Sequence, residues 1–194
     1  NEGLKNEEKR LKEKNYFDKE NIGHFYGIFE IRGLYLKASY LLEVGEIESA
    51  ENVCKEILKL NENDNTGSRY LLMGIYAILT KEQDLLKLSK KYSENALEVL
   101  FPLFALYYNL DNTKKAKEYL KKINESNSHF IKYFKGPLKP NKDVIQGCYV
   151  KGEVSEVIMY FSQYRFLIDT LPNLKEFVLE NDNQKWINNN LYTI

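Results

Sequence analysis

Apolar residues recur at helical spacing along most of the chain. From His24 to Val44 they fall three or four positions apart, and Ile47 to Leu60 repeats the pattern. Such spacing places apolar side chains on one face of an α-helix, so both segments are predicted to be amphipathic helices. Gly45 lies in the polar joint between them and can end the first helix in the left-handed conformation. The two segments therefore predict a helical hairpin.

The same arrangement recurs twice further along the chain. Tyr70–Leu79 with Asp84–Tyr92 predicts a second hairpin, and Ala96–Asn109 with Thr113–Ile123 predicts a third. Short polar joints separate the two helices of each pair. Alternating, strand-like patterns of convincing length are missing from the sequence. The chain is therefore predicted to be all-α.

Equivalent positions in the three hairpins are regularly spaced. Aligned by the residue that follows each predicted turn, the hairpins place Ala50, Leu85 and Ala116 at equivalent positions, at intervals of 35 and 31 residues, close to the period of about 34 residues in tetratricopeptide repeats. Two helices cross at this position, which favours small side chains, so the larger Leu85 predicts a more open second hairpin. The predicted fold is an α-α superhelix of tetratricopeptide-like hairpins with a C-terminal helical cap.

This organisation divides the chain into three parts. We expect a charged arm or helix in residues 1–22, about three hairpins in 23–126, and a helical cap and tail in 127–194. In the cap we expect a short helix begun by Ser128, a loop around Pro137 and Pro140, a helix from about Glu153 through Ile168, and a last helix near Asn173–Glu180. We expect Trp186, Ile187 and Leu191 of the tail to dock as a latch.

The polar joint NENDNTGSRYLL, residues 61–72, separates the first two hairpins. Asp64 or Asn65 is placed to accept hydrogen bonds from the free amides of the next helix, and Gly67 keeps the first turn slim. Arg69 would be electrostatically unfavourable beside the positive end of that helix unless an acid paired with it. We expect Glu30, or another acid of the first hairpin, to bind it.

Residues 57–72, ILKLNENDNTGSRYLL, resemble a stretch shared by a group of tetratricopeptide-like proteins, LNPNDN followed by two residues containing glycine and then RYLL. Glu62 replaces the usual proline. Glu30 and Arg32 are similar to the glutamate and arginine on the first helix of that group, and the resemblance extends over about residues 25–134. It implies an all-helical repeat fold that binds other proteins, and it implies neither an enzyme nor a ligand.

Composition favours an ordinary globular protein. Hydrophobic residues make up 43% of the chain, the formal net charge is zero, and no apolar run approaches the roughly 20 residues that span a membrane. We expect no membrane partner and a cytoplasmic location. The excess of lysine over arginine and the abundant asparagine suggest an AT-rich, bacterial genome.

Few residues offer catalytic or metal-binding chemistry. The histidines, His24 and His129, lack a metal-binding partner three or four residues further along the chain, and Cys54 and Cys148 lie far apart outside any CxxC pair. No phosphate-binding, zinc-protease or hydrolase motif occurs. We therefore expect no metal, no cofactor and no enzymatic activity.

Two surfaces remain as candidate binding sites. The first helix of each tetratricopeptide-like hairpin lines a concave groove, where aromatic side chains can bind a peptide or a helix. Packing between repeats is an equally open interpretation of the same aromatics. The candidate groove residues are Arg32, Tyr35, Ser39, Arg69, Tyr70, Gly74, Glu98, Phe101, Tyr108 and Asn109. The alternative is a nucleic-acid-associated role for the lysine-rich region 114–142, where bases are mixed with aromatics.

Overall fold

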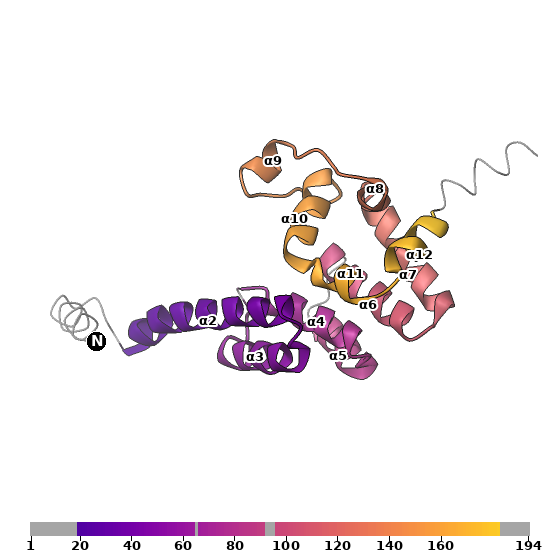
Figure 1. Cartoon of the computed structure of the whole chain (residues 1–194). Helices are drawn as coiled ribbons and strands as arrows, with labels where there is room; N and C mark the ends of the chain where they lie inside the picture. The colour runs from indigo at the N-terminus through magenta and orange to yellow at the C-terminus, as the bar shows by residue number, and fades with distance from the viewer. Residues whose placement is uncertain (1–18, 65, 92–95, 183–194) are drawn as a thin grey trace, which may run out of the picture. The chain divides into compact units, whose positions relative to one another are not determined.

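The computed structural model describes residues 19–64, 66–91 and 96–182, with side chains from residue 30 onward, and within these ranges it contains helices and no strand (Figure 1). The predicted all-α class is confirmed. The hairpin region contains α2 (Lys19–Glu43), α3 (Ile47–Leu60), α4 (Ser68–Ile78), α5 (Glu82–Lys91), α6 (Leu97–Asn109) and α7 (Thr113–Ser126). The C-terminal region contains α8 (Phe130–Lys135), α9 (Lys142–Ile145), α10 (Val154–Tyr164), α11 (Phe166–Thr170) and α12 (Leu174–Glu180).

The helices form two compact units. The first unit ends at Ser68 and is built on α2 and α3, and the second begins at Arg69 and contains the remaining helices. This division does not coincide with the predicted boundaries after residues 22 and 126. Residues 19–22 of the predicted arm belong to α2, and the rest of the arm lies outside the described residues.

The three predicted hairpins end their first helices in the same turn. Gly45, Thr80 and Asp111 adopt left-handed φ angles of 81°, 53° and 54°, as the sequence predicted for Gly45. The next residue in each case donates its amide to the carbonyl five positions back: Glu46 to Leu41 at 2.8 Å, Lys81 to Tyr76 at 2.9 Å and Asn112 to Tyr107 at 2.9 Å. This bonding defines a Schellman motif, which satisfies carbonyls at a helix end. The turns lie 35 and 31 residues apart.

The position five residues after each turn is fully buried in all three hairpins, at Ala50, Leu85 and Ala116. α2 packs along α3, and α6 along α7. Leu85 is a larger side chain than the alanines at the equivalent positions of the other two hairpins, where the two helices of a hairpin cross. The more open second hairpin that Leu85 predicts stays a prediction.

The core of the second unit surrounds α6. Every residue from Leu97 to Tyr107 is buried, because α5, α7 and α10 all pack against this helix (Figure 1). Phe101 lies at the centre, with its ring centroid 5.3 Å from that of Phe161 and 5.6 Å from that of Phe130. Edge-to-face and tilted aromatic pairs of this kind add to the stabilisation from burial itself.

The C-terminal cap departs from its prediction in three places. Ser128 does not begin α8; Asn127 accepts the His129 amide at 2.9 Å instead. The short helix α9 begins in the last two residues of the segment 135–143 that was predicted as a loop, and the predicted helix from Glu153 to Ile168 is interrupted at Arg165, between α10 and α11. The helix does end before Pro172, and α12 matches the last prediction. The tail with Trp186, Ile187 and Leu191 lies outside the described residues.

The polar joint before α4 acts as a helix start, as predicted. Asp64, which is buried, accepts the backbone amide of Ser68 through Oδ1 at 2.8 Å, and Ser68 is the first residue of α4. Thr66 also bonds to Asp64 Oδ1, at 3.3 Å. Gly67 has a φ of 73°, so glycine serves backbone conformation here rather than a slim first turn. Asn65 lies outside the described residues.

Candidate functional site

α2 carries apolar side chains on two opposite faces. Ile31, Ala38 and Leu42 are buried against α3 within the first unit. On the other side Leu36 is 69% exposed, Tyr40 is 62% exposed, and Val44, just after the helix, is 52% exposed. We call these three residues the α2 stripe. Large apolar side chains aligned on one uncovered helix face are typical of an interaction surface.

The spacing of the α2 stripe gives it a defined shape. Its residues follow one another at intervals of four, so they lie nearly in line along the helix. Arg32, which is exposed, precedes Leu36 by the same interval. Tyrosine and arginine are the residue types most often responsible for binding energy at protein interfaces. The face thus combines an apolar line with a cation at one end.

Sequence reasoning identified only part of this face. Of the three groove candidates on α2, Arg32 is exposed, while Tyr35 and Ser39 are half-buried toward the edge of the hairpin contact. The Ser39 hydroxyl donates to the Tyr35 carbonyl at 3.1 Å, within the helix itself. The stripe residues were missed because the apolar pattern was assigned to a single buried face. The four-residue spacing of Leu36, Tyr40 and Val44 was the available signal.

Two groove candidates of the second unit belong to the core instead. Phe101 is 0% exposed, which supports the packing interpretation of the aromatics. Gly74 is buried where α4 meets α11, and a Cβ atom there would lie 2.7 Å from Cζ of Phe166. The cap helices α10 and α11 cover the positions that an open groove would expose, so neither residue lines a free surface.

Two other candidates, Tyr108 and Asn109, hold elements of the second unit together, and a third, Glu98, is buried. Tyr108 donates its hydroxyl to the Pro172 carbonyl at 2.6 Å, joining α6 to the segment before α12. The Asn109 side-chain amide donates to the carbonyls of Ala77 at 3.2 Å and Ile78 at 2.8 Å. These are carbonyls at the end of α4, where helical partners run out. Glu98 is buried in the first turn of α6.

Arg69 and Tyr70 form a local pair at the start of α4. The Arg69 Nη2 atom donates to the Tyr70 hydroxyl at 2.8 Å, and the guanidinium carbon lies 4.4 Å from the centroid of the Tyr70 ring. Both side chains are half-buried. Glu30 belongs to the first unit and Arg69 to the second, and the expected ion pair between them stays a prediction.

The lysine-rich region offers charge, but most of its aromatic rings are engaged in packing. Its lysines are exposed, but several are paired: Lys115 with Glu82 at 3.4 Å, Lys121 with Glu125 at 3.8 Å, Lys122 with Glu118 at 2.7 Å and Lys135 with Asp182 at 2.7 Å. Phe130 and Phe134 are buried, and Tyr133 stacks on Phe161 with centroids 4.3 Å apart. These rings are therefore not available for stacking on bases.

Lys115 has a structural role in the same region. It lies 4.3 Å above the centroid of the Tyr107 ring, and its Nζ atom is 3.3 Å from the Tyr107 hydroxyl, which donates to Glu82 at 3.0 Å. The hydrogen bond with Tyr107 raises the pKa of Lys115, while burial is the main cause of the raised pKa of Tyr107. This contact connects α5, α6 and α7.

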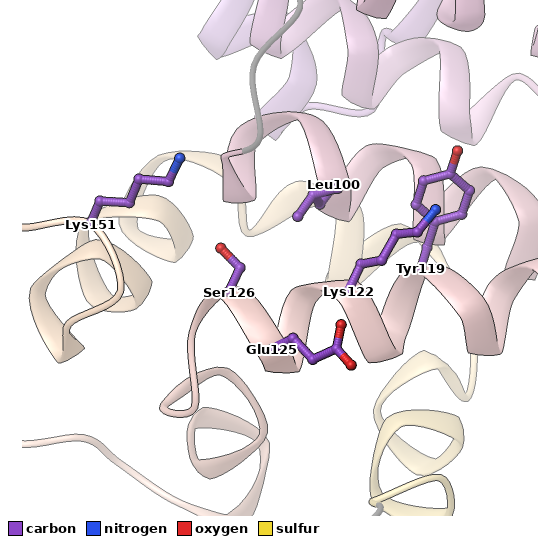
Figure 2. Close-up of a pocket in the computed structure, with 6 residues that line it drawn as sticks. All are labelled: Leu100, Tyr119, Lys122, Glu125, Ser126 and Lys151. Atoms are coloured by element: carbon purple, nitrogen blue, oxygen red, sulfur yellow. The ribbon is translucent and has the colours of Figure 1, made fainter.

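A shallow hollow of about 490 Å³ lies on the second unit. Figure 2 shows its lining: Leu100 from α6, Tyr119, Lys122, Glu125 and Ser126 from α7, and Lys151 from the segment before α10. Lys122 is held by Glu118 and lies 4.7 Å from the centroid of the Tyr119 ring. Glu125 is paired with Lys121, and the described residues that line the hollow show no cluster of cations that would hold an anion.

The remaining chemical candidates are dispersed. Within residues 19–64, 66–91 and 96–182, no three histidine, cysteine, aspartate or glutamate side chains come together as a metal ion requires. Cys54 is buried and Cys148 is exposed, both as free thiols. Burial is the main cause that raises the pKa of Cys54 to about 12, with Asp64 and Glu51 adding to it. His129 is half-buried at the start of α8.

The fold and these surfaces define an all-helical protein built from hairpins with a common turn. Comparison with protein-family models, with curated proteins and with solved structures finds no match to this chain. In the part of the chain that the structure describes, no helix has both the length and the apolar character needed to cross a membrane.

Proposed function

We propose that this chain is a non-enzymatic protein-interaction module of the tetratricopeptide-like type, and that it binds an amphipathic helix of a partner protein along the α2 stripe. The exposure of Leu36, Tyr40 and Val44 on α2 carries the proposal. The repeated hairpin turns and the resemblance of residues 57–72 support the tetratricopeptide-like type, and a cytoplasmic location is part of the same proposal.

The form of the surface favours a helical partner. Leu36 to Val44 covers eight residue steps of the helical segment and the turn after it, or about 12 Å at the helical rise. A helix of similar length with apolar residues at intervals of three and four can lie along such a line. Tyr40 is the central anchor, and Arg32 is placed to bind an acid of the partner.

The proposal can be tested by site-specific photo-cross-linking. A photoreactive phenylalanine analogue replaces Tyr40 in one variant and Glu56, an exposed residue of α3, in a matched control. We expect a partner to be captured from position 40 and not from position 56. The captured protein is then purified and its affinity measured by calorimetry.

Substitutions decide whether the α2 stripe carries the binding. Leu36→Ala combined with Tyr40→Ala should weaken the purified partner's affinity at least tenfold, which corresponds to about 1.4 kcal/mol, while Glu56→Ala leaves it unchanged. Circular dichroism checks that the helix content is retained. Equal affinity of the double variant and the unaltered chain would refute the assignment of the stripe.

The nucleic-acid alternative rests on charge alone. Lys114, Lys117 and Lys132 are exposed and form no ion pair among the described residues. Binding through such contacts weakens steeply as salt rises. A gel shift with generic RNA that disappears with added salt, and on reversing Lys114, Lys115 and Lys121 to glutamate, would favour this alternative.

A further inference from the structure

The segment between α8 and α10, residues 136–153, exposes a second apolar group. We call this segment the α9 loop, after the short helix within it (Figure 1). Ile145 is 80% exposed, Tyr149 51% and Val150 50%, and Cys148 between them is exposed as well. None of these residues belongs to the α2 stripe, so the loop needs an explanation of its own.

Specific hydrogen bonds hold the α9 loop in shape. The Asn141 side chain caps α9 by accepting the Val144 amide at 3.2 Å, and the Cys148 amide donates to the Asp143 carbonyl at 2.9 Å. The apolar tip is therefore presented by an ordered turn.

The base of the loop is fixed to α10. The buried Ser155 hydroxyl accepts the Val150 amide at 3.0 Å, and the buried Glu156 carboxylate accepts the Gly152 amide at 2.8 Å. These bonds satisfy backbone groups near Tyr149 and Val150, whose side chains are about half exposed. The exposure of the apolar residues thus follows from how the loop is anchored.

The α9 loop also carries three exposed lysines. Lys139, Lys142 and Lys151 are exposed, and none forms an ion pair within the described residues. Asp143 is half-buried and accepts a hydrogen bond from the Asn141 side-chain amide at 2.9 Å, which leaves Glu153 as the exposed acid of the segment. The loop therefore offers aliphatic side chains, one tyrosine and an excess of positive charge.

We propose that the α9 loop docks on the surface of an anionic lipid bilayer. Ile145 and Val150 enter the boundary of the acyl chains, Tyr149 lies at the level of the headgroups, and the three lysines contact lipid phosphates and carboxylates. Aliphatic tips insert into lipid, tyrosine suits the interface, and lysine stems reach outward while their apolar parts stay buried. The charge complements the negative inner leaflet of a cell membrane.

The residue types at the tip favour a lipid surface over a nucleic acid as the binding partner. A single-stranded nucleic acid is bound by several stacked aromatics, and the α9 loop exposes one ring, that of Tyr149. The proposal departs from the expectation of no membrane partner, which rested on the lack of an apolar run long enough to span a bilayer, because a surface contact needs no such run. Docking through this loop would not use the residues of the α2 stripe, which could still bind a protein partner.

The exposed Cys148 provides a probe at the tip. A polarity-sensitive fluorophore attached there in the full chain reports insertion, since Cys54 is buried and its thiol stays protonated. We expect a blue shift with vesicles of phosphatidylcholine and phosphatidylserine, a much smaller one with phosphatidylcholine alone, and reversal by high salt. No shift with the mixed vesicles would overturn the proposal, as would a shift with generic RNA only.

Sedimentation of unlabelled protein with the same vesicles tests the residues. Ile145→Asp with Val150→Asp should lower partitioning at least tenfold, and Lys139→Glu with Lys142→Glu should remove its dependence on phosphatidylserine. Leu60→Asp, at another exposed leucine, is the matched control and should change nothing, as should Tyr40→Ala. Unchanged partitioning of the Ile145/Val150 variant would show that the loop is not the contact, whatever the fate of the α2 stripe.

Discussion

α2 in the first unit and α6 in the second both begin a hairpin and end in the same Schellman turn, yet they are covered very differently. Neighbouring helices bury α6 from Leu97 to Tyr107, whereas Leu36 and Tyr40 of α2 remain exposed. A helix with apolar residues all round is normally enclosed. The second unit provides that enclosure from its own cap, and we infer that the first unit obtains it from a partner.

The largest expected difference between α6 and α2 is the loss of stability when one apolar residue of each helix is truncated to alanine. Phe101→Ala removes a fully buried ring and should lower the free energy of unfolding by about 3–5 kcal/mol. Leu36→Ala should change it by no more than about 0.5 kcal/mol. Urea titrations followed by circular dichroism measure both. A comparable loss for Leu36→Ala would mean that the chain itself covers the α2 stripe in solution.

Substituting one glycine on each side of this comparison should change the free energy of unfolding in opposite directions. A Cβ at Gly74 would lie 2.7 Å from Phe166 Cζ and 3.2 Å from Leu167 Cδ1, whereas a Cβ at Gly33 of α2 meets nothing within 4 Å. Overpacking should make Gly74→Ala destabilising by about 1 kcal/mol, even after the gain in helix propensity. Gly33→Ala should stabilise by about 0.5–1 kcal/mol. Thermal melts of the two variants give the signs directly.

The two units share the same left-handed turn, but different residues occupy it. Gly45 in the first unit carries no side-chain strain, while Thr80 in the second holds a φ of 53°, which is costly for a β-branched residue. We expect Gly45→Ala to destabilise by about 1 kcal/mol and Thr80→Gly to stabilise by somewhat less than about 1 kcal/mol. Chemical denaturation measures both. A destabilising Thr80→Gly would show that its hydroxyl bond to the Leu79 carbonyl, at 2.8 Å, outweighs the strain.

The thiols of Cys54 and Cys148 should differ in their reactivity toward alkylating reagents at neutral pH. Iodoacetamide should modify Cys148 in the native chain, and Cys54 only after unfolding, as mass spectrometry can show. The pKa of Cys54 is raised from 9.0 to about 12, so the unfolded chain releases this proton first as pH rises. Its contribution to stability is therefore complete below about pH 9 and is lost between pH 9 and 12. Rapid native modification of Cys54 would contradict its burial.

Features encoded over short stretches were predictable from the sequence. The hairpins follow from apolar spacing, and Gly45 and Asp64 mark their ends through the local chemistry of glycine and aspartate. The burial of Phe101 and Gly74 was not predictable in this way, because it depends on α10 and α11, which follow much later in the chain. The α2 stripe was not predicted for a related reason. The spacing of apolar residues shows which helix face they share, but not whether another element covers that face.

The common turn also bears on the order in which the chain acquires structure. Its defining bonds, such as Glu46 to Leu41 and Asn112 to Tyr107, join residues five apart, so each can form without closing a long loop. Ribosomes add about 5–20 residues per second, so successive turns, 35 and 31 residues apart, emerge roughly 2–7 seconds after one another, far more slowly than a helix forms. The α2–α3 hairpin can thus fold, and present its stripe, while the second unit is still being synthesised.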